Sequence, residues 1–281
     1  MNKNVFTFIG CDNEYDESKI AIFGAPFDST TSFRPGTRFA SSVMRNESFG
    51  IETYSPYLDK DLEDICVFDC GDIELQFGSP QNALNDIEQF TKKLLDDNKV
   101  PCMIGGEHLV TLGAFKAVYN KYNDVYIVHF DAHADLREEY IGQTLSHACV
   151  IRRCHNLVGD NRIYQFGIRS GDRSEFEFAK EHVTQYKFDL KEFGEVVKKL
   201  KGKRVYFTLD LDVLDPSIFP GTGTPEAGGV TFNELLEAVH MLKDLNIVGC
   251  DINELSPHYD LSGTSTAVAC KILRELLLTI Y

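Results

Sequence analysis

Four carboxylates and two imidazoles in this sequence come at or just after the ends of apolar runs, which makes them candidates for one metal site. They are His108, Asp131, His133, Asp135, Asp210 and Asp212. Alternate residues of an extended chain point to the same side, so Asp131 can converge with His133, and Asp210 with Asp212. Four converging carboxylates would repel one another unless cations compensated their charge. The set therefore predicts a site for divalent metal ions.

The ligand types narrow the choice of metal. Carboxylates and imidazoles without a thiolate favour Mn²⁺-like ions over structural zinc. Six ligands exceed what one ion can use while it also holds water, whereas two ions that share bridging carboxylates use all six. Two ions about 3.5–4 Å apart can hold a shared water and convert it to hydroxide near neutral pH. The sequence therefore favours a two-metal hydrolytic centre.

Other interpretations of the single motifs stay open at this point. A lone Asp-x-His-x-Asp or Asp-x-Asp segment also suits a solvated turn, because aspartate caps turns freely. His129 has the same strand parity as Asp131 and is a rival ligand, although packing behind the metal ligands is favoured. Four further histidines are interpreted as surface or core residues: His155, His182, His240 and His258. The combination of motifs, each beside its own apolar run, is what favours a metal site.

Short apolar runs alternate with helix-period segments along most of the chain. The predicted strands are at 19–25, 64–70, 100–105, 125–130, 162–168, 182–188, 203–210 and 246–252. The predicted helices are at 83–97, 109–122, 190–200, 231–245 and 265–280. This alternation predicts a single α/β domain over residues 1–281, with three α/β/α layers and a mainly parallel central sheet of about eight strands. Sites in such folds form at the carboxyl ends of the strands, where the candidate ligands fall.

The overall composition limits the kinds of partner. The chain of 281 residues has a formal net charge of −15 at pH 7, which argues against nucleic acid and anionic membranes and suits a cationic substrate or metal ions. Eight scattered cysteines without a CxxC pair, and the lack of a secretory signal, predict reduced thiols in the cytoplasm. No apolar run approaches the roughly 20 residues that cross a bilayer.

A glycine- and proline-rich segment at 215–229 follows Asp212 directly. It can be interpreted as a string of turns, or as an ordered wall beside the metals that Pro216, Pro220 and Pro225 stiffen. The two interpretations are compatible. The segment lacks the Lys-Ser/Thr pair of a phosphate-binding loop, so phosphate binding is not expected there.

Six motifs in this chain resemble those of the ureohydrolases, the family of the arginases and agmatinases. They are PGTRFA at 35–40, GGEH at 105–108, DAHAD at 131–135, GIRSG at 167–171, LDLDVLDPSIFPGTGTPEAGG at 209–229 and DINEL at 251–255. The motifs occur in the family's order, and the resemblance covers roughly residues 18 to 281. Within the family, the chain is more similar to agmatinases than to arginases.

The resemblance implies an arginase-like fold, two Mn²⁺ ions per chain and a homo-oligomer, either a trimer or a hexamer. By motif, one ion would be held by His108, Asp131, Asp135 and Asp210, and the other by Asp131, His133, Asp210 and Asp212. Asp131 and Asp210 would then bridge the two ions.

The resemblance also implies roles for three residues in the reaction. A hydroxide bridging the ions would attack the guanidinium carbon of a substrate that Glu254 holds. Asp135 would stabilise the tetrahedral intermediate and relay a proton, and His147 would protonate the leaving amine. From the residues alone, His147 could equally be an inert residue at a helix start, and Glu254 an exposed loop carboxylate.

The substrate implied by the closer resemblance is agmatine, a small guanidino cation that would give urea and putrescine in polyamine biosynthesis. The segment 136–140 lacks the arginase pattern that holds an amino acid's carboxylate and amine. Glu138 and Glu139 could attract the ammonium of agmatine or form a solvated turn, whereas Arg137 could receive a carboxylate. Alternatives are therefore another guanidino-acid ureohydrolase, such as a guanidinobutyrase or an arginase-like enzyme, and a metal-binding paralogue without activity.

Overall fold

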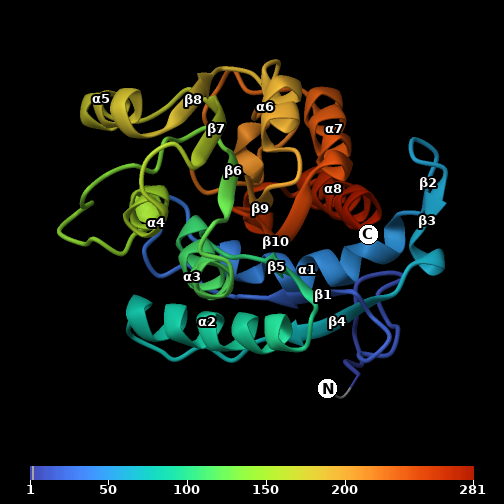
Figure 1. Cartoon of the computed structure of the whole chain (residues 1–281). Coiled ribbons are helices and arrows are strands. Elements are labelled where there is room, and N and C mark those ends of the chain that lie inside the picture. Colours follow the sequence, from blue (N-terminus) through green and yellow to red (C-terminus); the bar gives the residue numbers. More distant parts are fainter. Residues whose placement is uncertain (2) are drawn as a thin grey trace.

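The centre of the protein is an eight-stranded sheet in the order β4-β1-β5-β10-β9-β6-β7-β8 (Figure 1). The computed structural model describes residue 1 and residues 3–281. The strands of this sheet are β1 (Ile20–Gly24), β4 (Val67–Asp72), β5 (Val100–Ile104), β6 (Tyr126–Phe130), β7 (Ile163–Ile168), β8 (Thr184–Lys187), β9 (Arg204–Asp210) and β10 (Asn246–Asn253). Each pairing in the sheet is parallel. A separate antiparallel pair joins β2 (Tyr54–Ser55) to β3 (Lys60–Asp61).

Helices cover both faces of the sheet and form the two outer layers. One face packs against α1 (Ala40–Glu47), α6 (Phe193–Leu200), α7 (Phe232–Met241) and α8 (Thr264–Ile280). The other face packs against α2 (Pro80–Asp96), α3 (Thr111–Lys121), α4 (Val150–Val158) and α5 (Arg173–His182). Figure 1 shows α2 and α3 on one side of the strands and α6, α7 and α8 grouped on the other. The predicted three-layer α/β/α architecture is confirmed.

Local sequence explains where these helices begin and which side they bury, as α2 illustrates. Ser79 accepts a hydrogen bond from the N–H of Asn82 at 3.4 Å, and Pro80 occupies the first position, where its missing N–H costs nothing. Apolar residues then recur at helical spacing and are buried: Ala83, Leu84, Ile87, Leu94 and Leu95. The helix stops before Asn98, whose φ of 58° is left-handed.

The register of the sheet brings the ends of its four middle strands level. Phe130 of β6 pairs with Leu209 of β9, and Asn253 of β10 pairs with Asp210. Ile252 of β10 pairs with Ile104 of β5. The residues that follow β5, β6, β9 and β10 therefore meet at one edge, in the middle of the sheet. The chain passes there from β5 on one side to β6 on the other, which is the place where open α/β sheets bind ligands.

Each of the eight predicted strands overlaps one strand of the large sheet, and each of the five predicted helices overlaps one α-helix. Three helices lay outside the prediction, namely α1, α4 and α5. α1 is fixed by a buried ion pair, because the guanidinium of Arg45 contacts Asp69 at 2.8 Å and Asp72 at 2.5 Å on β4. The helix buries only two apolar side chains, Ala40 and Met44, which is too short a pattern to predict it.

Candidate metal centre and active site

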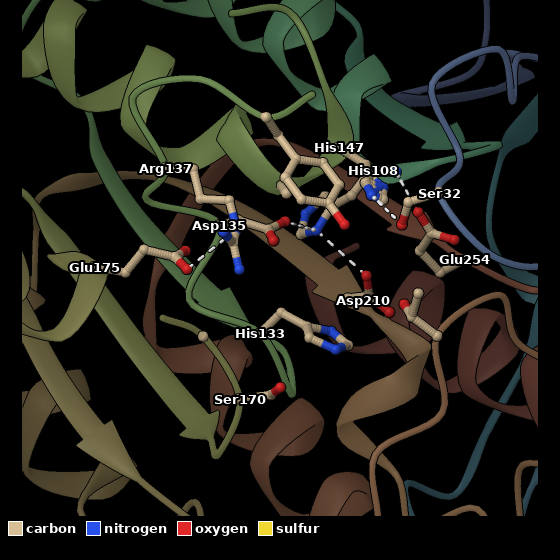
Figure 2. A pocket seen from close by; sticks show the side chains of 14 residues that line it. Ser32, His108, His133, Asp135, Arg137, His147, Ser170, Glu175, Asp210 and Glu254 are labelled. Carbon is tan, nitrogen blue, oxygen red and sulfur yellow. Dashed lines mark hydrogen bonds and ion pairs between the residues drawn. The ribbon is translucent and has the colours of Figure 1, made fainter. Parts of the chain in front are cut away.

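His108 lies at the centre of a group of buried carboxylates. Its Nδ1 is 3.0 Å from Asp131 Oδ2, 3.3 Å from Asp135 Oδ2 and 3.3 Å from Asp210 Oδ2. Figure 2 shows three members of this group, His108, Asp135 and Asp210, facing one another. The structure thus brings together the four residues that were predicted to hold one ion.

The hydrogen bond of the other ring nitrogen of His108, Nε2, determines whether Nδ1 needs to carry a proton. Nε2 lies 2.9 Å from the Thr208 hydroxyl, which donates to Asp251 at 2.6 Å. Because the hydroxyl proton goes to Asp251, Thr208 accepts from Nε2–H of His108, so Nδ1 is the nitrogen that can offer a lone pair to a cation. Nδ1 is buried without a hydrogen-bond partner among the described residues. A lone pair and three carboxylates that face one point fit a bound cation.

A second group forms around His133. Its Nδ1 is 2.9 Å from Asp212 Oδ2 and 3.5 Å from Asp131 Oδ1, and the N–H of Asp212 donates to Asp210 Oδ1 at 2.8 Å. Asp131 belongs to both groups, since its Oδ2 faces His108 and its Oδ1 faces His133. One carboxylate with an oxygen toward each group has the geometry of a bridging ligand.

His129 lies behind Asp131 rather than in the ligand group. Gln165 donates to its Nδ1 at 3.0 Å, so Nε2 carries the proton and donates to Asp131 Oδ2 at 2.8 Å. A ring nitrogen that carries a proton has no lone pair for a metal. The interpretation of His129 as packing behind the ligands therefore agrees with the geometry.

The electrostatics of the group also fit cations. Burial, reinforced by the charge of Asp131, raises the pKa of Asp135 to about 7. Burial and the charges of Asp212 and Asp131 raise the pKa of Asp210 well above its usual range. Burial lowers the pKa of His108, but the close carboxylates of Asp131, Asp135 and Asp210 outweigh it and raise the pKa well above normal. The cluster strongly favours positive charge, and an oxygen-rich set with two imidazoles suits two divalent ions.

Glu254 follows β10 and lines the same cavity. Its N–H donates to the carbonyl of Gly106 at 3.0 Å, and its Oε1 accepts the backbone N–H of His108 at 2.7 Å. The φ of Glu254 is 67° and that of Asp135 is 53°, conformations that cost free energy in residues other than glycine and that concentrate at functional sites. Glu254 is only 5% exposed, and burial raises its pKa well above the usual range. The interpretation as an exposed loop carboxylate is wrong.

His147 begins the short 3₁₀ helix His147–Cys149, which leads into α4. Its Nε2 lies 3.2 Å from Ser32 Oγ (Figure 2), and its backbone N–H donates to Thr30 Oγ1 at 3.1 Å. Thr30 in turn is held by the buried carboxylate of Glu107, which accepts from the backbone N–H of Thr30 at 2.7 Å and from its hydroxyl. Burial and the charges of His133 and His108 lower the pKa of His147 to about 4, so its ring is neutral near pH 7.

Four of the proposed ligands, His108, His133, Asp135 and Asp210, line a cavity of about 230 Å³ together with His147. Its wall includes residues that the sequence analysis did not select as candidates for the site: Ser32, Tyr140, Ala148, Ser170, Gly171, Glu175 and Thr224. The ring of Tyr140 stacks on that of His147, with centroids 5.9 Å apart. A single Ser, Thr or Tyr belongs to no recognisable sequence pattern, so most of these residues could not be predicted. Ser170, Gly171 and Thr224 are exceptions, because they lie within the GIRSG motif and the glycine-rich segment.

The charged residues of segment 136–140 are largely neutralised by neighbours. Arg137 lines the cavity, but its guanidinium contacts Asp172 at 2.7 Å and Glu175 at 3.4 Å. Glu138 points to Arg152 at 2.8 Å and Arg153 at 2.9 Å. Glu138 and Glu139 are not among the described residues that line the cavity. The solvated-turn interpretation fits Glu138 better than a role in attracting substrate.

The glycine-rich segment 215–229 contains turns, as expected, and also forms part of the cavity wall. Asp215 closes a turn by accepting from the N–H groups of Gly228 at 2.8 Å and Gly229 at 3.0 Å. Thr224 lines the cavity, and a Cβ at Gly223 would lie 3.4 Å from the Glu254 carboxylate. The segment is therefore a series of turns that also forms one wall beside Glu254.

The remaining histidines and the cysteines lie outside this cavity. His240 contacts Glu275 at 2.8 Å, and His258 is exposed. His155 and His182 lie at the ends of α4 and α5, where both contact Asp160. All eight cysteines are free, which agrees with the expected reduced thiols. Within the described part of the chain, no helix is both long enough and apolar enough to cross a membrane.

The fold and the carboxylate–histidine cluster define a class of hydrolase, and the sequence as a whole agrees. Residues 18–279 match the Arginase family, and the chain belongs to that family. An arginase from Medicago truncatula is 27% identical and superimposes with a TM-score of 0.81, covering 94% of this chain and 88% of that one.

Within the family, several of the similar proteins are agmatinases. An agmatinase from Bacillus cereus is 50% identical over 96% of this chain and 95% of its own, and one from Bacillus subtilis is 48% identical over the same shares. The agmatine ureohydrolase structure from Thermoplasma volcanium is 34% identical with a TM-score of 0.89, covering 99% of this chain and 94% of that one. The resemblance inferred from the motifs is confirmed.

Proposed function

We propose that this protein is an agmatinase that hydrolyses the guanidinium group of agmatine to urea and putrescine with two Mn²⁺ ions. The observation that carries the proposal is the bridging arrangement of Asp131, with one oxygen toward His108 and the other toward His133, beside a cavity that Glu254 also lines. The agmatinases from Bacillus cereus and Bacillus subtilis, at 50% and 48% identity over nearly the whole chain, support the choice of substrate.

The proposed ligands are those that the motifs implied. His108, Asp131, Asp135 and Asp210 would hold one ion, and Asp131, His133, Asp210 and Asp212 the other. When bound, the ions supply a nucleophilic hydroxide near neutral pH. The four aspartates balance the charge of two divalent cations, which removes the penalty that raises the pKa of Asp135 and Asp210.

The chain's own side chains would bind the substrate and move protons. The Glu254 carboxylate binds the guanidinium by charge and hydrogen bonding, and its fixed backbone conformation orients it. Asp135 accepts hydrogen bonds from the amino groups of the tetrahedral intermediate and can relay a proton. His147 is neutral near pH 7, so it could accept the proton released from the attacking oxygen and pass it to the nitrogen of the leaving amine, a role worth about 10²–10⁴-fold in rate.

The pairing of Arg137 favours agmatine over a guanidino acid. A substrate carboxylate would need a free cation in the wall of the cavity, but Arg137 is already paired with Asp172 and Glu175. Replacing those pairs would leave the carboxylate of Glu175, which is only 2% exposed, without its cation. The ammonium of agmatine requires no such exchange.

A guanidino-acid hydrolase is the second candidate, since a human mitochondrial guanidino acid hydrolase is 33% identical over 92% of this chain and 77% of its own. A metal-binding paralogue without activity is a third, although a structural role would not require Glu254 or His147 beside the cluster. The test is urea release by the Mn²⁺-loaded protein from agmatine, arginine and 4-guanidinobutyrate, with putrescine identified as the co-product. No urea from any of them would refute the enzymatic assignment.

We further propose that the chain is one cytoplasmic ureohydrolase domain that acts as a homo-oligomer, a trimer or a hexamer, in polyamine synthesis. Its partners would be the small guanidino cation and other copies of itself, and neither nucleic acid nor membrane. Light scattering of the purified protein measures the number of subunits directly, and a stable monomer would contradict this part of the proposal.

A further inference from the structure

Two histidines and an aspartate come together on the surface at the far ends of α4 and α5. His155 lies in the last turn of α4, His182 ends α5, and Asp160 lies in the turn between α4 and β7. One potential ligand atom from each of the three residues lies within 4.8 Å of the other two. The three residues are not among those that line the catalytic cavity. His155 is eight positions beyond His147 in the chain, which corresponds to roughly 12 Å along a helix.

The three side chains already converge on one oxygen. Asp160 Oδ1 is 2.8 Å from His155 Nε2 and 2.8 Å from His182 Nδ1, so both imidazoles direct a nitrogen at the same carboxylate. These separations approach those between neighbouring ligands on a transition-metal ion, whose bonds to imidazole and carboxylate are about 2.0–2.2 Å. Small rotations of the side chains would let an ion replace the two shared protons.

The surroundings hold these ligands in place. Phe178 of α5 stacks on His182 with centroids 4.2 Å apart and meets His155 edge-on at 5.0 Å. The turn that carries Asp160 is fixed by left-handed residues on either side, Gly159 with a φ of 74° and Asn161 with a φ of 62°. The N–H of Asn161 also donates to the carbonyl of His182 at 3.3 Å. The ligands are therefore ordered before an ion arrives, which reduces the entropic cost of binding.

We propose that His155, Asp160 and His182 bind a third metal ion per chain, of the Zn²⁺ type, separate from the aspartate-rich catalytic centre. A site with two imidazoles and one carboxylate suits a borderline ion such as Zn²⁺. The catalytic cluster, with its four carboxylates, suits Mn²⁺ instead. The charges that face the site are Asp160 itself, Glu181, 4.0 Å from His182, and Arg152, whose guanidinium lies 3.7 Å from the centre of the Phe178 ring. Arg152 is paired with Glu138 at 2.8 Å, which reduces its repulsion of a cation.

The bound ion would join two helices whose opposite ends support the active site. α4 is preceded by His147, and the first turn of α5 contains Glu175, which accepts the N–H of Leu136 at 2.9 Å. At the other ends, the ion would cross-link α4 to α5 through His155 and His182. We therefore expect the ion to stabilise the fold, with a higher unfolding temperature in the presence of Zn²⁺.

The test is the total metal content of full-length, Mn²⁺-loaded protein after addition of Zn²⁺ and gel filtration. Wild type should retain one more ion per chain than Asp160→Asn, whichever metals occupy the catalytic centre. Asparagine still accepts hydrogen bonds from both imidazoles but lacks the anionic charge, so this variant is expected to fold. His182→Asn should lose the same ion, whereas His258→Asn, an exposed histidine outside both sites, should retain it.

Equal metal content in wild type and Asp160→Asn would overturn the proposal, as would an unchanged unfolding temperature of wild type with Zn²⁺. Urea release is not part of this test. Failure of the third site therefore leaves the proposed agmatinase activity untouched, and failure of that activity leaves the metal difference between wild type and Asp160→Asn in place.

Discussion

Asp131 is the side chain on which the two halves of the metal centre depend. Its two oxygens face different histidines at 3.0 and 3.5 Å, while His129 donates to it from behind. Asp131→Ala should therefore lose both ions, because each ion would lose a ligand and the cluster its shared charge. Elemental analysis of the purified variant measures this. Asp124→Ala, an exposed aspartate that pairs with Arg204, is the matched control and should keep both ions. Two retained ions in Asp131→Ala would refute the ligand assignment.

His147 has a separable role, because it lies on the cavity wall and not in the ligand group. His147→Asn should keep both ions and lower the rate of urea release by about 10²–10⁴-fold, the usual worth of a positioned proton donor. Steady-state kinetics and metal content, measured on the same preparation, check this. Turnover equal to wild type would remove the proton-transfer role, and loss of metal would show that the variant disturbs the cluster instead.

At the scale of the elements, the link between β5 and the catalytic loops depends on close backbone packing. A Cβ at Gly106 would lie 1.9 Å from the carbonyl oxygen of Phe27, so backbone must move to accommodate it. Gly106→Ala should destabilise the fold by about 1–3 kcal/mol, as overpacking does, and displace His108. Denaturant unfolding measures the change. Gly50→Ala meets nothing within 4 Å and should stay within about 0.5 kcal/mol of wild type. Equal stabilities of the two variants would contradict the conclusion that the backbone at Gly106 packs too closely for a side chain.

The elements that sequence could predict are those with an apolar period. The strands are buried on both faces and read as apolar runs, and helices such as α2 and α8 have a long apolar side. α4 is only nine residues long, so its apolar side is short, although Val150, Ile151 and Cys154 are buried on it. α5 buries only Glu175 and Ala179 and has no hydrophobic period that identifies it. α5 is held by polar contacts, such as the capping box of Asp172 and Glu175, which become recognisable only once the partners are known.

In the candidate site, too, some residues could be predicted from the sequence and others could not. The residues that cluster around His108 and His133 lie in motifs with strand spacing, so the sequence predicted them as a set. The contacts from Thr208, Glu107 and Ser32 link segments between 77 and 115 residues apart, and no local pattern announces them. The sequence therefore predicts the residues that meet the metals better than those that orient them.

At the scale of the whole molecule, metal binding should couple to stability in a pH-dependent way. Burial raises the pKa of Asp135 to about 7 in the folded chain, whereas an unfolded aspartate ionises near 3.9. The folded state therefore binds this proton more tightly, and the metal-free protein is most stable below about pH 4 with respect to this group. That contribution is lost as the pH rises through about 7, and Asp210, whose pKa is also raised, acts in the same direction.

Bound cations compensate the ionised carboxylates, so the stabilisation by Mn²⁺ should grow as the pH rises. The difference in unfolding temperature between Mn²⁺-loaded and metal-free protein is expected to be larger at pH 8 than at pH 5. Differential scanning calorimetry at both values measures it. A difference that is equal at the two pH values, or smaller at pH 8, would show that the buried carboxylates are not what the ions stabilise.

We expect the cavity to accept the cation agmatine, because Arg137 in its wall is already paired with Asp172 and Glu175. The most direct measurement is kcat/KM for urea release by the Mn²⁺-loaded protein with agmatine and with 4-guanidinobutyrate, which carry the same guanidinium and differ at the other end in charge. We expect a preference for agmatine of at least about tenfold, since a carboxylate would face Glu175 and a pre-paired Arg137. A preference for 4-guanidinobutyrate would contradict the account.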